Sequence, residues 1–332
     1  MHTFADLTTL RVGGPIAEFV EARTTEELLD TIRAADAVGR DALVIGDGSN
    51  LLVGDGGFAG LVVRVATQHI AGGSDDAIWF DAGFDWDSAV QHTLDNGYSG
   101  LEALSGIPGR VGGAPVQNVG AYGALTSDVL AHVTVYDRES GEVENWSKEQ
   151  CDFGRHRTSI FKHSRRWVIL SVGFVLSRNL LRPVRYQALA DQLGVVLGDL
   201  APATEIREAV LALRRRRGMV LDSDDHDTWS VGSFFLNPVV TCVPDTAKDG
   251  PSWPDESGIK LSAAWLIEHA GFPKGYGNDK VTLSAKHTLA ITNRGHATTE
   301  DVLALAGEIR TGVQEHFGIT LEPECHLINC SL

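Results

Sequence analysis

The sequence predicts an α+β protein built from two or three modules, and three observations support this fold class. The chain has 332 residues, of which 43% are hydrophobic, so it can bury more than one core of ordinary domain size. Strand and helix patterns alternate along its first hundred residues. The glycine-rich stretch GDGSN (46–50) follows one apolar strand segment and runs into another, LLV. A dinucleotide fingerprint should open a helix at this point, so a doubly wound fold is disfavoured.

Strand patterns are short apolar or alternating runs bounded by turn residues. They cover residues 17–22, 42–46, 61–65, 77–83, 132–137, 143–146, 167–176 and 319–329. In the middle of this series, residues 100–123 contain many glycines together with Pro108 and Pro115. That composition predicts an irregular loop.

Five helices are expected, because apolar residues recur at helical spacing after a start signal. Their expected first residues or caps are Thr24 (with Glu27), Trp86, Thr204 (with Glu208), Ser262 and Thr298. Asn96, Gly271 and Gly318 are expected to end the second, fourth and fifth. The third helix ends in the basic run RRRR, where positive charge suits the helix dipole.

The charge balance excludes two broad classes of partner. With 44 acidic and 28 basic residues the net charge is −16, so general attraction to nucleic acid or anionic lipid is not expected. No secretory signal is apparent at the N-terminus, and no apolar run approaches the roughly 20 residues of a membrane span. We therefore expect a soluble cytoplasmic protein, and a monomer.

Two side-chain groups resemble metal sites without meeting their spacing rules. The four cysteines, Cys151, Cys242, Cys325 and Cys330, are scattered, which indicates reduced structural thiols. The acidic residues between 222 and 227 are adjacent and lack the spacing of a calcium loop. We interpret them as a solvated loop and expect no metal.

Two glycine-rich loops are candidates for holding an extended dinucleotide. GDGSNLLVGDGG (46–57) offers backbone N–H groups with the side chains of Ser49 and Asn50, which suits a pyrophosphate. IPGRVGGAPVQNVGAYG (107–123) adds Gln117 and Asn118, which suit a large flat polar ring. Tight turns in a β-rich domain remain the alternative for the first loop. The second is too rich in glycine to serve as a simple connection without a large entropic cost.

Ser233 lies in the stretch SVGSFFLNP, between a glycine and two phenylalanines. The two rings can shield this hydroxyl from water. No histidine or lysine within the stretch can activate Ser233 as a nucleophile, and Phe235 occupies the place of the second glycine of a hydrolase elbow. These features argue against a nucleophile and leave the role of Ser233 open, with a turn residue as the structural interpretation.

The chain resembles the UDP-N-acetylenolpyruvoylglucosamine reductase family over nearly its whole length. The motifs RVGG, VIGDGSNLLV, GLEALSGIPGRVGGAPVQNVGAYG, RTSIFK, GSFFLNP and LEPE occur in the family's order and spacing. The resemblance implies an FAD-binding module of the vanillyl-alcohol-oxidase type, made of two α+β subdomains, and a C-terminal α+β substrate domain. The implied borders are residues 1–66 with a returning tail 323–332, residues 67–215, and residues 216–322.

The resemblance also implies an activity. FAD, reduced by NADPH, would reduce UDP-N-acetylglucosamine enolpyruvate to UDP-N-acetylmuramate, a precursor of peptidoglycan. Ser233 matches the family's proton donor, which fits a carbanion that needs a proton. Arg157 of RTSIFK and Glu324 of LEPE match the positions that stabilise the developing charge. We expect Glu324 to be protonated or paired with Arg157, since a bare carboxylate would repel an anion.

The two glycine loops supply the expected FAD-binding residues. These are Gly46, Asp47, Gly48, Ser49, Asn50, Leu51, Pro108, Gly109, Gly113, Gln117, Asn118, Gly120, Ala121, Tyr122 and Gly123. The expected substrate contacts are Tyr186, in the family subgroup with a tyrosine loop, Asn237, His287 and Arg217.

The sequence departs from the family pattern after GSFF, where some relatives have lysine and this chain has Leu236. The basic run 214–217 is expected to contact phosphate instead, although a solvated helix end explains it equally well. Two other classes remain as alternatives to the reductase. An FAD oxidase would need no shielded serine, and a non-catalytic flavin-binding protein would tolerate the loss of Ser233, Arg157 and Glu324.

Overall fold

The computed structural model describes residues 2–72, 77–154, 158–162 and 164–332. The chain forms two compact units. Unit 1 comprises Met1–Ile16, Gly48–Phe58 and Arg217–Leu332, and unit 2 comprises Ala17–Asp47 and Ala59–Arg216. The first glycine loop therefore runs from unit 2 into unit 1, because Asp47 and Gly48 lie on either side of the border.

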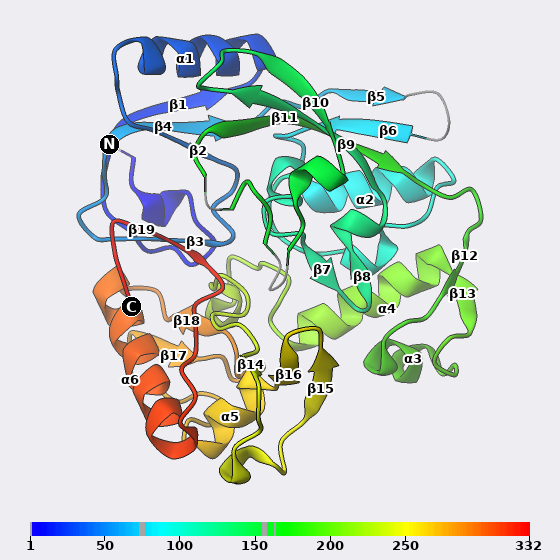
Figure 1. Cartoon of the computed structure of the whole chain (residues 1–332), viewed down its shortest axis with the longest axis vertical. Helices are drawn as coiled ribbons and strands as arrows, with labels where there is room; N and C mark the ends of the chain where they lie inside the picture. Colours follow the sequence, from blue (N-terminus) through cyan, green and yellow to red (C-terminus); the bar gives the residue numbers. More distant parts are fainter. Residues whose placement is uncertain (1, 73–76, 155–157, 163) are drawn as a thin grey trace. The chain divides into compact units, whose positions relative to one another are not determined.

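Unit 2 contains two sheets and two helices that share one hydrophobic core (Figure 1). The three-stranded sheet has the order β1 (Ile16–Ala22), β4 (Phe58–Val65), β2 (Ala42–Ile45). The antiparallel five-stranded sheet has the order β10 (Val143–Ser147), β9 (Leu130–Asp137), β11 (Trp167–Val175), β6 (Ala77–Asp81), β5 (Ile70–Gly72). The helices are α1 (Thr25–Ala37) and α2 (Trp86–Asp95). Alternating apolar residues of the strands, such as Val133 and Val135, line the core.

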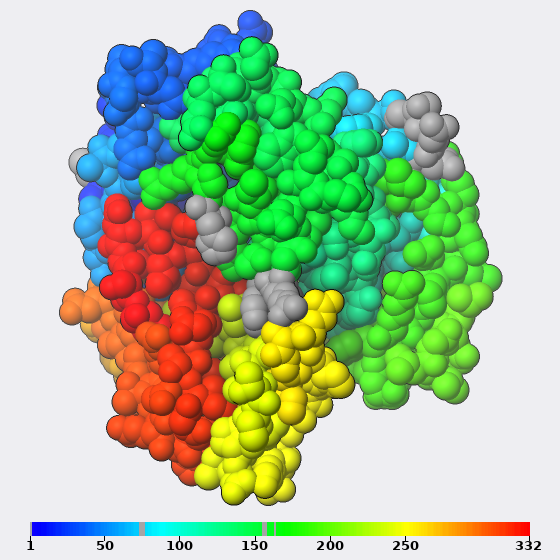
Figure 2. All heavy atoms as spheres, viewed as in Figure 1, coloured from blue at the N-terminus to red at the C-terminus, as the bar shows by residue number. Residues whose placement is uncertain are grey.

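A helical insert forms the rest of unit 2. Strands β12 (Leu181–Pro183) and β13 (Leu200–Pro202) pair, and helices α3 (Gln187–Leu193) and α4 (Ala203–Arg216) pack on them. The insert has a small core of its own around Val184, Leu189 and Val210. Figure 2 shows it in light green at the surface of the unit.

Unit 1 contains three small sheets around a second core. β3 (Leu51–Val53) pairs in parallel with β19 (His326–Ile328). β14 (Val239–Val240), β16 (Gly258–Leu261) and β15 (Ser252–Asp255) form a second sheet, and β17 (Val281–Leu283) with β18 (Ile291–Asn293) a third. Helices α5 (Ala263–His269) and α6 (Thr299–Phe317) cover the core through Leu266, Ile267 and Ile309.

Short elements account for much of the remaining chain. The 3-10 helices are η1 (Phe4–Asp6), η2 (Glu102–Leu104), η3 (Val111–Gly113), η4 (Thr126–Asp128), η5 (Glu149–Cys151), η6 (His226–Thr228) and η7 (Asp245–Ala247). β7 (Gly120–Ala121) and β8 (Ala124–Leu125) form a two-residue ladder. The expected irregular loop 100–123 is thus confirmed as a series of turns.

Most of the expected helix starts are confirmed by their capping bonds. The Thr24, Ser262 and Thr298 side chains accept hydrogen bonds from the first turns of α1, α5 and α6. Gly318 ends α6 with φ of 70°.

Two expectations about the elements were wrong, and one helix was not expected. α4 begins at Ala203, one residue before the expected cap, because Thr204 already lies inside the helix. The strand expected over 319–329 is reduced to His326–Ile328, since Phe235 and Pro323 meet in an isolated bridge before it. α3 was not expected at all. No helix of the described residues is both long and apolar enough to cross a membrane.

Candidate functional site

In unit 1 the segment that carries Ser233 pairs with the segment that carries Glu324. The Glu324 backbone N–H donates to the Phe234 carbonyl over 2.8 Å, and Leu236 N–H donates to Glu322 over 2.9 Å. Phe235 and Pro323 form the bridge between these two bonds. The two candidate catalytic residues are therefore held on neighbouring backbone segments, 91 residues apart in sequence.

The two phenylalanines after Ser233 anchor its loop in the core of unit 1. Phe234 and Phe235 are 0% and 1% exposed, and their rings meet edge-on at 5.0 Å. Gly232 has φ of 79°, a conformation in which a side chain would be strained. Ser233 itself is half-buried. The rings thus act first as anchors of the backbone that presents the hydroxyl.

Glu324 lies beside the part of the first glycine loop that belongs to unit 1. The Asn50 amide nitrogen is 3.5 Å from the Glu324 carbonyl oxygen, and His326 N–H donates to the Asn50 carbonyl over 2.9 Å. Glu324 is 8% exposed. One unit therefore brings together Gly48–Leu51, the Ser233 segment and Glu324.

Arg157 lies outside the described residues, but the rest of its motif is placed. Gly154 N–H donates to the Thr158 carbonyl over 3.1 Å. The buried Ser159 donates its hydroxyl to the Val116 carbonyl over 2.6 Å. Within unit 2 the motif RTSIFK is thus attached to the second glycine loop.

Asp47 connects the two glycine loops of unit 2 through an ion-pair network. Its carboxylate oxygens lie 2.7 Å from Arg64 Nη2 and 2.7 Å from Arg110 Nε. Arg110 also donates to the Gly83 carbonyl over 3.0 Å. Sequence reasoning missed both arginines. An arginine inside the apolar strand LVVRV and another among the glycines of IPGRVGG were the available signals.

The second glycine loop combines fixed backbone with an open face. A Cβ atom at Gly112 would lie 2.6 Å from Ala82 Cβ, whereas no atom of the described residues lies within 4 Å of such an atom at Gly113. Gly109 and Asn118 have positive φ of 127° and 42°. Loop geometry of this kind leaves room for a flat group to approach the backbone at Gly113. The donor set of both loops fits FAD.

Several members of the second loop have structural partners. Trp86 N–H donates to the Gly109 carbonyl, which follows Pro108. The buried Asn118 accepts from Ser127 N–H over 2.9 Å, and Gly120 with Ala121 form β7. Gln117 lies between these contacts. These bonds attach the loop to neighbouring segments of unit 2.

Tyr122 contacts the insert that carries Tyr186. Their rings meet edge-on at 5.5 Å, and Tyr186 is 41% exposed. A cavity of about 120 Å³ lies beside them, lined by Gly123, Glu102, Asp128, Arg182 and Arg185 among others.

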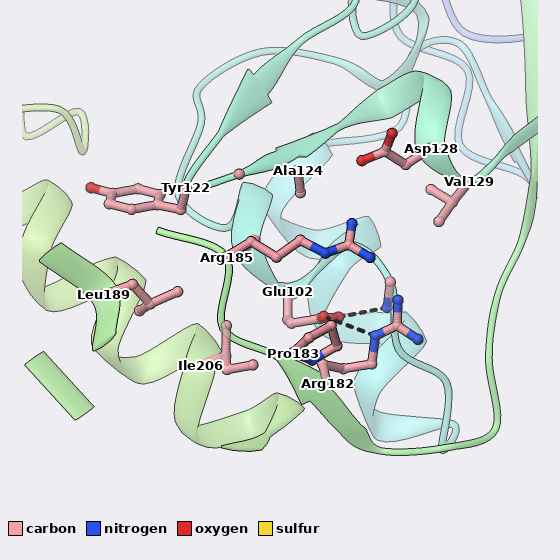
Figure 3. Close-up of a pocket in the computed structure, with 13 residues that line it drawn as sticks. Glu102, Tyr122, Ala124, Asp128, Val129, Arg182, Pro183, Arg185, Leu189 and Ile206 are labelled. Carbon is pink, nitrogen blue, oxygen red and sulfur yellow. Dashed lines mark hydrogen bonds and ion pairs between the residues drawn. The ribbon is translucent and has the colours of Figure 1, made fainter. Parts of the chain in front are cut away.

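In this cavity, Arg182 approaches Glu102, and Arg185 points between Glu102 and Asp128 (Figure 3). The two arginines are balanced by the two carboxylates. Small-molecule pockets are typically about 300–1,000 Å³, so this cavity is too small for a nucleotide sugar. We infer that the residues around this cavity support Tyr122 and the helical insert that carries Tyr186.

The other expected substrate residues are spread over unit 1. Asn237 accepts from Ala263 N–H over 2.9 Å at the start of α5. His287 is half-buried, and its N–H donates to Ser284. Arg217 is half-buried directly after α4.

The acidic loop 222–227 is engaged with basic partners. Buried Asp227 lies 3.1 Å from Arg294, and Asp225 pairs with Lys286. Thr228 donates to the Asp222 carbonyl over 2.8 Å. The solvated interpretation therefore agrees with Asp222 and Asp224, which are exposed, and fails for Asp227, which is buried. Among the residues described, no cluster of potential metal ligands is present.

Comparisons with known proteins bear on both units. Residues 16–147 match a family model described as an FAD binding domain, and residues 224–328 match the UDP-N-acetylenolpyruvoylglucosamine reductase C-terminal domain. A UDP-N-acetylenolpyruvoylglucosamine reductase of Thermobifida fusca is 50% identical, over 99% of this chain and 97% of the relative. The chain belongs to the UDP-N-acetylenolpyruvoylglucosamine reductase family.

Two further relatives agree with this family assignment. The reductase of Nocardia farcinica is 51% identical, over 96% of this chain and 87% of its own. The crystal structure of the reductase from Thermus caldophilus is 28% identical, with a TM-score of 0.69 over 98% and 97% of the two chains. The expected fold class, an FAD-binding module of the vanillyl-alcohol-oxidase type with a C-terminal α+β domain, is confirmed. The protein is an FAD-dependent oxidoreductase.

Proposed function

We propose that this protein reduces UDP-N-acetylglucosamine enolpyruvate to UDP-N-acetylmuramate, a step of peptidoglycan precursor synthesis, with NADPH as electron donor. The observation that carries the proposal is the hydrogen bond between Glu324 and Phe234. It pairs the backbone segment of the candidate acid Ser233 with that of Glu324, whose carbonyl oxygen lies 3.5 Å from the Asn50 amide nitrogen of the flavin loop in the same unit. Family membership supplies the substrate class.

When bound, FAD supplies a hydride, taken from NADPH, for the enolpyruvyl double bond. Addition of that hydride leaves negative charge on the neighbouring carbon of the substrate, delocalised into its carboxylate. We assign the proton for this carbon to the Ser233 hydroxyl, which acts as a general acid and never as a nucleophile. The anchoring of Phe234 and Phe235 in the core supports a fixed position for this hydroxyl.

Arg157 and Glu324 are assigned to the substrate carboxylate, where negative charge grows during the reaction. A preorganised cation or hydrogen-bond donor lowers the energy of such charge. A charged carboxylate would repel it, so Glu324 is proposed to be protonated or paired with Arg157 in the working complex. The burial of Glu324 supports this role, because desolvation disfavours an unpaired charge.

Tyr186, Asn237, His287 and Arg217 are proposed to contact the uridine and the diphosphate. Tyr186 is exposed on the insert, as a residue that closes on a ligand must be. Arg217 would take the place of the lysine that is absent where Leu236 stands. Asn237 has its amide oxygen engaged at α5, so its amide nitrogen is the proposed donor.

The proposed setting is the cytoplasm, and the proposed form is a monomer that binds no nucleic acid. The net charge of −16 supports the last point. The proposed division is residues 1–66 with 323–332, residues 67–215 and residues 216–322. Light scattering after size exclusion tests the monomer, because a dimer would have twice the mass of 35.7 kDa.

The experiment that tests the function separates its two halves. The purified protein with FAD bound is reduced anaerobically with one equivalent of NADPH, and loss of flavin absorbance is followed. UDP-N-acetylglucosamine enolpyruvate is then added. Prompt return of the oxidised flavin spectrum with formation of UDP-N-acetylmuramate is the expected result.

Other outcomes point to other functions. Recovery of the oxidised spectrum only after oxygen is admitted would favour an oxidase. Failure of NADPH to reduce the flavin, with reduction by another donor, would remove NADPH from the proposal and leave the substrate in place.

A further inference from the structure

A turn near the N-terminus, Leu7–Val12, packs against the flavin loop of unit 1. Gly48 of that loop has φ of 55°. A Cβ atom at Gly48 would lie 2.7 Å from the Leu7 carbonyl oxygen and 2.8 Å from Thr8 Cγ2. The first contact is to backbone, which cannot move away by changing a rotamer. The turn and the flavin loop therefore have a fixed separation.

The same turn is bonded to the loop that leads to Ser233. The Thr9 hydroxyl donates to the Ser230 carbonyl over 2.7 Å, and both residues are buried. Ser230 Oγ in turn accepts from Gly232 N–H over 3.2 Å. The Arg11 guanidinium lies 3.9 Å from the centre of the Trp229 ring, in a cation–π contact. These contacts link the position of the turn to the position of Gly232, the residue before Ser233.

Asn293 is hydrogen-bonded to both residues of the cation–π contact, Arg11 and Trp229. Its amide nitrogen donates to the carbonyls of Leu10 and Arg11 over 3.1 and 3.0 Å, and its backbone N–H donates to the Trp229 carbonyl over 3.1 Å. Its amide oxygen accepts from Gly295 and Ala297 N–H. The side chain is 2% exposed and uses all four of its hydrogen-bonding positions. Arg11 is held at φ of 56°, which is costly without such support.

We propose that the turn Leu7–Val12, locked by Asn293, is a positioning element that sets the distance between the flavin loop and the loop of Ser233. The inference rests on the proposed function, in which Ser233 protonates the substrate after hydride transfer. None of these residues is placed at the substrate. Their effect is on the geometry of proton donation, where small displacements are costly in rate.

Thr9→Val tests the proposal, because it keeps the shape of the side chain and removes only the hydroxyl that reaches Ser230. Thr9→Ser keeps that hydroxyl. Ser99→Ala is the control, since the buried Ser99 hydroxyl likewise donates to a distant backbone carbonyl, that of Asn179 in unit 2, over 2.8 Å. Arg11→Met is a second variant. Arg11 is half-buried, so its substitution disturbs folding less than that of the buried Thr9.

Each variant is measured with FAD bound, in both half-reactions, with FAD affinity by fluorescence and urea unfolding alongside. For Thr9→Val we expect a substrate half-reaction slowed about 10- to 100-fold with a larger solvent deuterium isotope effect. Flavin reduction by NADPH and the FAD dissociation constant should change by less than about twofold. Thr9→Ser should restore the rate, and Ser99→Ala should only lower stability. Arg11→Met should slow the substrate half-reaction selectively, as Thr9→Val does, but by a smaller factor.

Three results would overturn the positioning role. They are equal slowing of both half-reactions by Thr9→Val, an equal effect of Ser99→Ala, and a wild-type substrate half-reaction rate in both Thr9→Val and Arg11→Met. If Thr9→Val does not fold, the Arg11→Met result decides. A wild-type protein whose reduced flavin is not reoxidised by the enolpyruvyl substrate would overturn the proposed function itself, and the positioning role with it.

Discussion

The backbone N–H of Glu324 donates a hydrogen bond to the carbonyl oxygen of Phe234 over 2.8 Å. This bond joins the LEPE motif to the GSFF motif, whose serine precedes Phe234. A residue whose place is set by its backbone can present its side chain with little reorganisation, which is what charge stabilisation and proton donation require.

Ser233→Ala should leave the protein yellow and reducible by NADPH. Turnover of the sugar nucleotide should fall by about 10²–10⁴-fold, because a general acid is lost. Stopped-flow absorbance of the flavin measures both half-reactions. Ser262→Ala is the control, as it removes a serine that caps α5 in the same unit and should lower only stability. Retained turnover in Ser233→Ala would remove this residue from the mechanism.

Glu324→Gln should be milder than Glu324→Ala if the residue acts as a neutral hydrogen-bond donor. Glutamine keeps the volume and a donor, whereas alanine leaves the developing charge without a partner. Steady-state kcat of both variants is compared with that of Glu322→Gln, which alters an exposed carboxylate paired with Arg310. Equal and complete loss in both Glu324 variants would contradict a neutral donor.

Asp47→Asn should weaken FAD binding about tenfold. Its carboxylate pairs with Arg64 and Arg110, and a hydrogen bond to a charged group contributes about 1.5–3 kcal/mol. Loss of that charge loosens the connection between the two glycine loops of unit 2. Flavin fluorescence titration gives the dissociation constant. Asp41→Asn, which removes the partner of Arg165 at an exposed site, should bind FAD like the wild type. The same affinity in both variants would argue against Asp47 as an organiser of the loops.

Asp137→Asn should flatten the loss of stability at acidic pH. Hydrogen bonds from Arg166 hold the pKa of the buried Asp137 carboxyl well below its usual range. A lowered pKa in the folded state contributes stability above the unfolded pKa, about 3.9, and that stability is lost as the pH falls through the folded value.

The wild type should therefore lose urea resistance between about pH 4 and lower pH more steeply than Asp137→Asn, which starts less stable at pH 7. Urea midpoints across this range measure the difference. Asp245→Asn, with a side chain 89% exposed, serves as control and should follow the wild-type curve. Parallel plots of urea midpoint against pH for the wild type and Asp137→Asn would contradict the lowered pKa of Asp137.

Local signals predicted the elements whose ends depend on neighbouring residues. Thr24, Ser262 and Thr298 cap their helices because the bonds that define a cap lie within one turn. Thr204 failed as a cap, because Ala203 N–H is bonded to the distant Leu180 carbonyl and the helix starts one residue early. α3 has only seven residues and buries Leu189 and Ala190 against α4, and so short a segment shows no helical periodicity in the sequence.

The candidate catalytic residues lie in motifs of contiguous residues that resemble those of the family, so the sequence could point to them, and their roles stay predictions. The sequence could not point to Arg64 and Arg110, since their role comes from Asp47, which is separated from them by 17 and 63 positions. The same holds for Asn293 and the turn at Thr9. Such supports become visible only when distant segments are placed in space.

The sequence alone determined the fold class, the two flavin loops and the identity of Ser233, Arg157 and Glu324 as the residues to examine. The loops follow from composition and spacing, whereas the three residues follow from the resemblance of their motifs to those of the reductase family. The tertiary structure decided the partners: Phe234 for Glu324, Asp47 for two arginines, and Ser230 for Thr9. The physical reason is that a buried polar group forms its hydrogen bonds with the groups that pack around it. Those groups come from segments that are distant in sequence, and no local sequence pattern identifies them as neighbours.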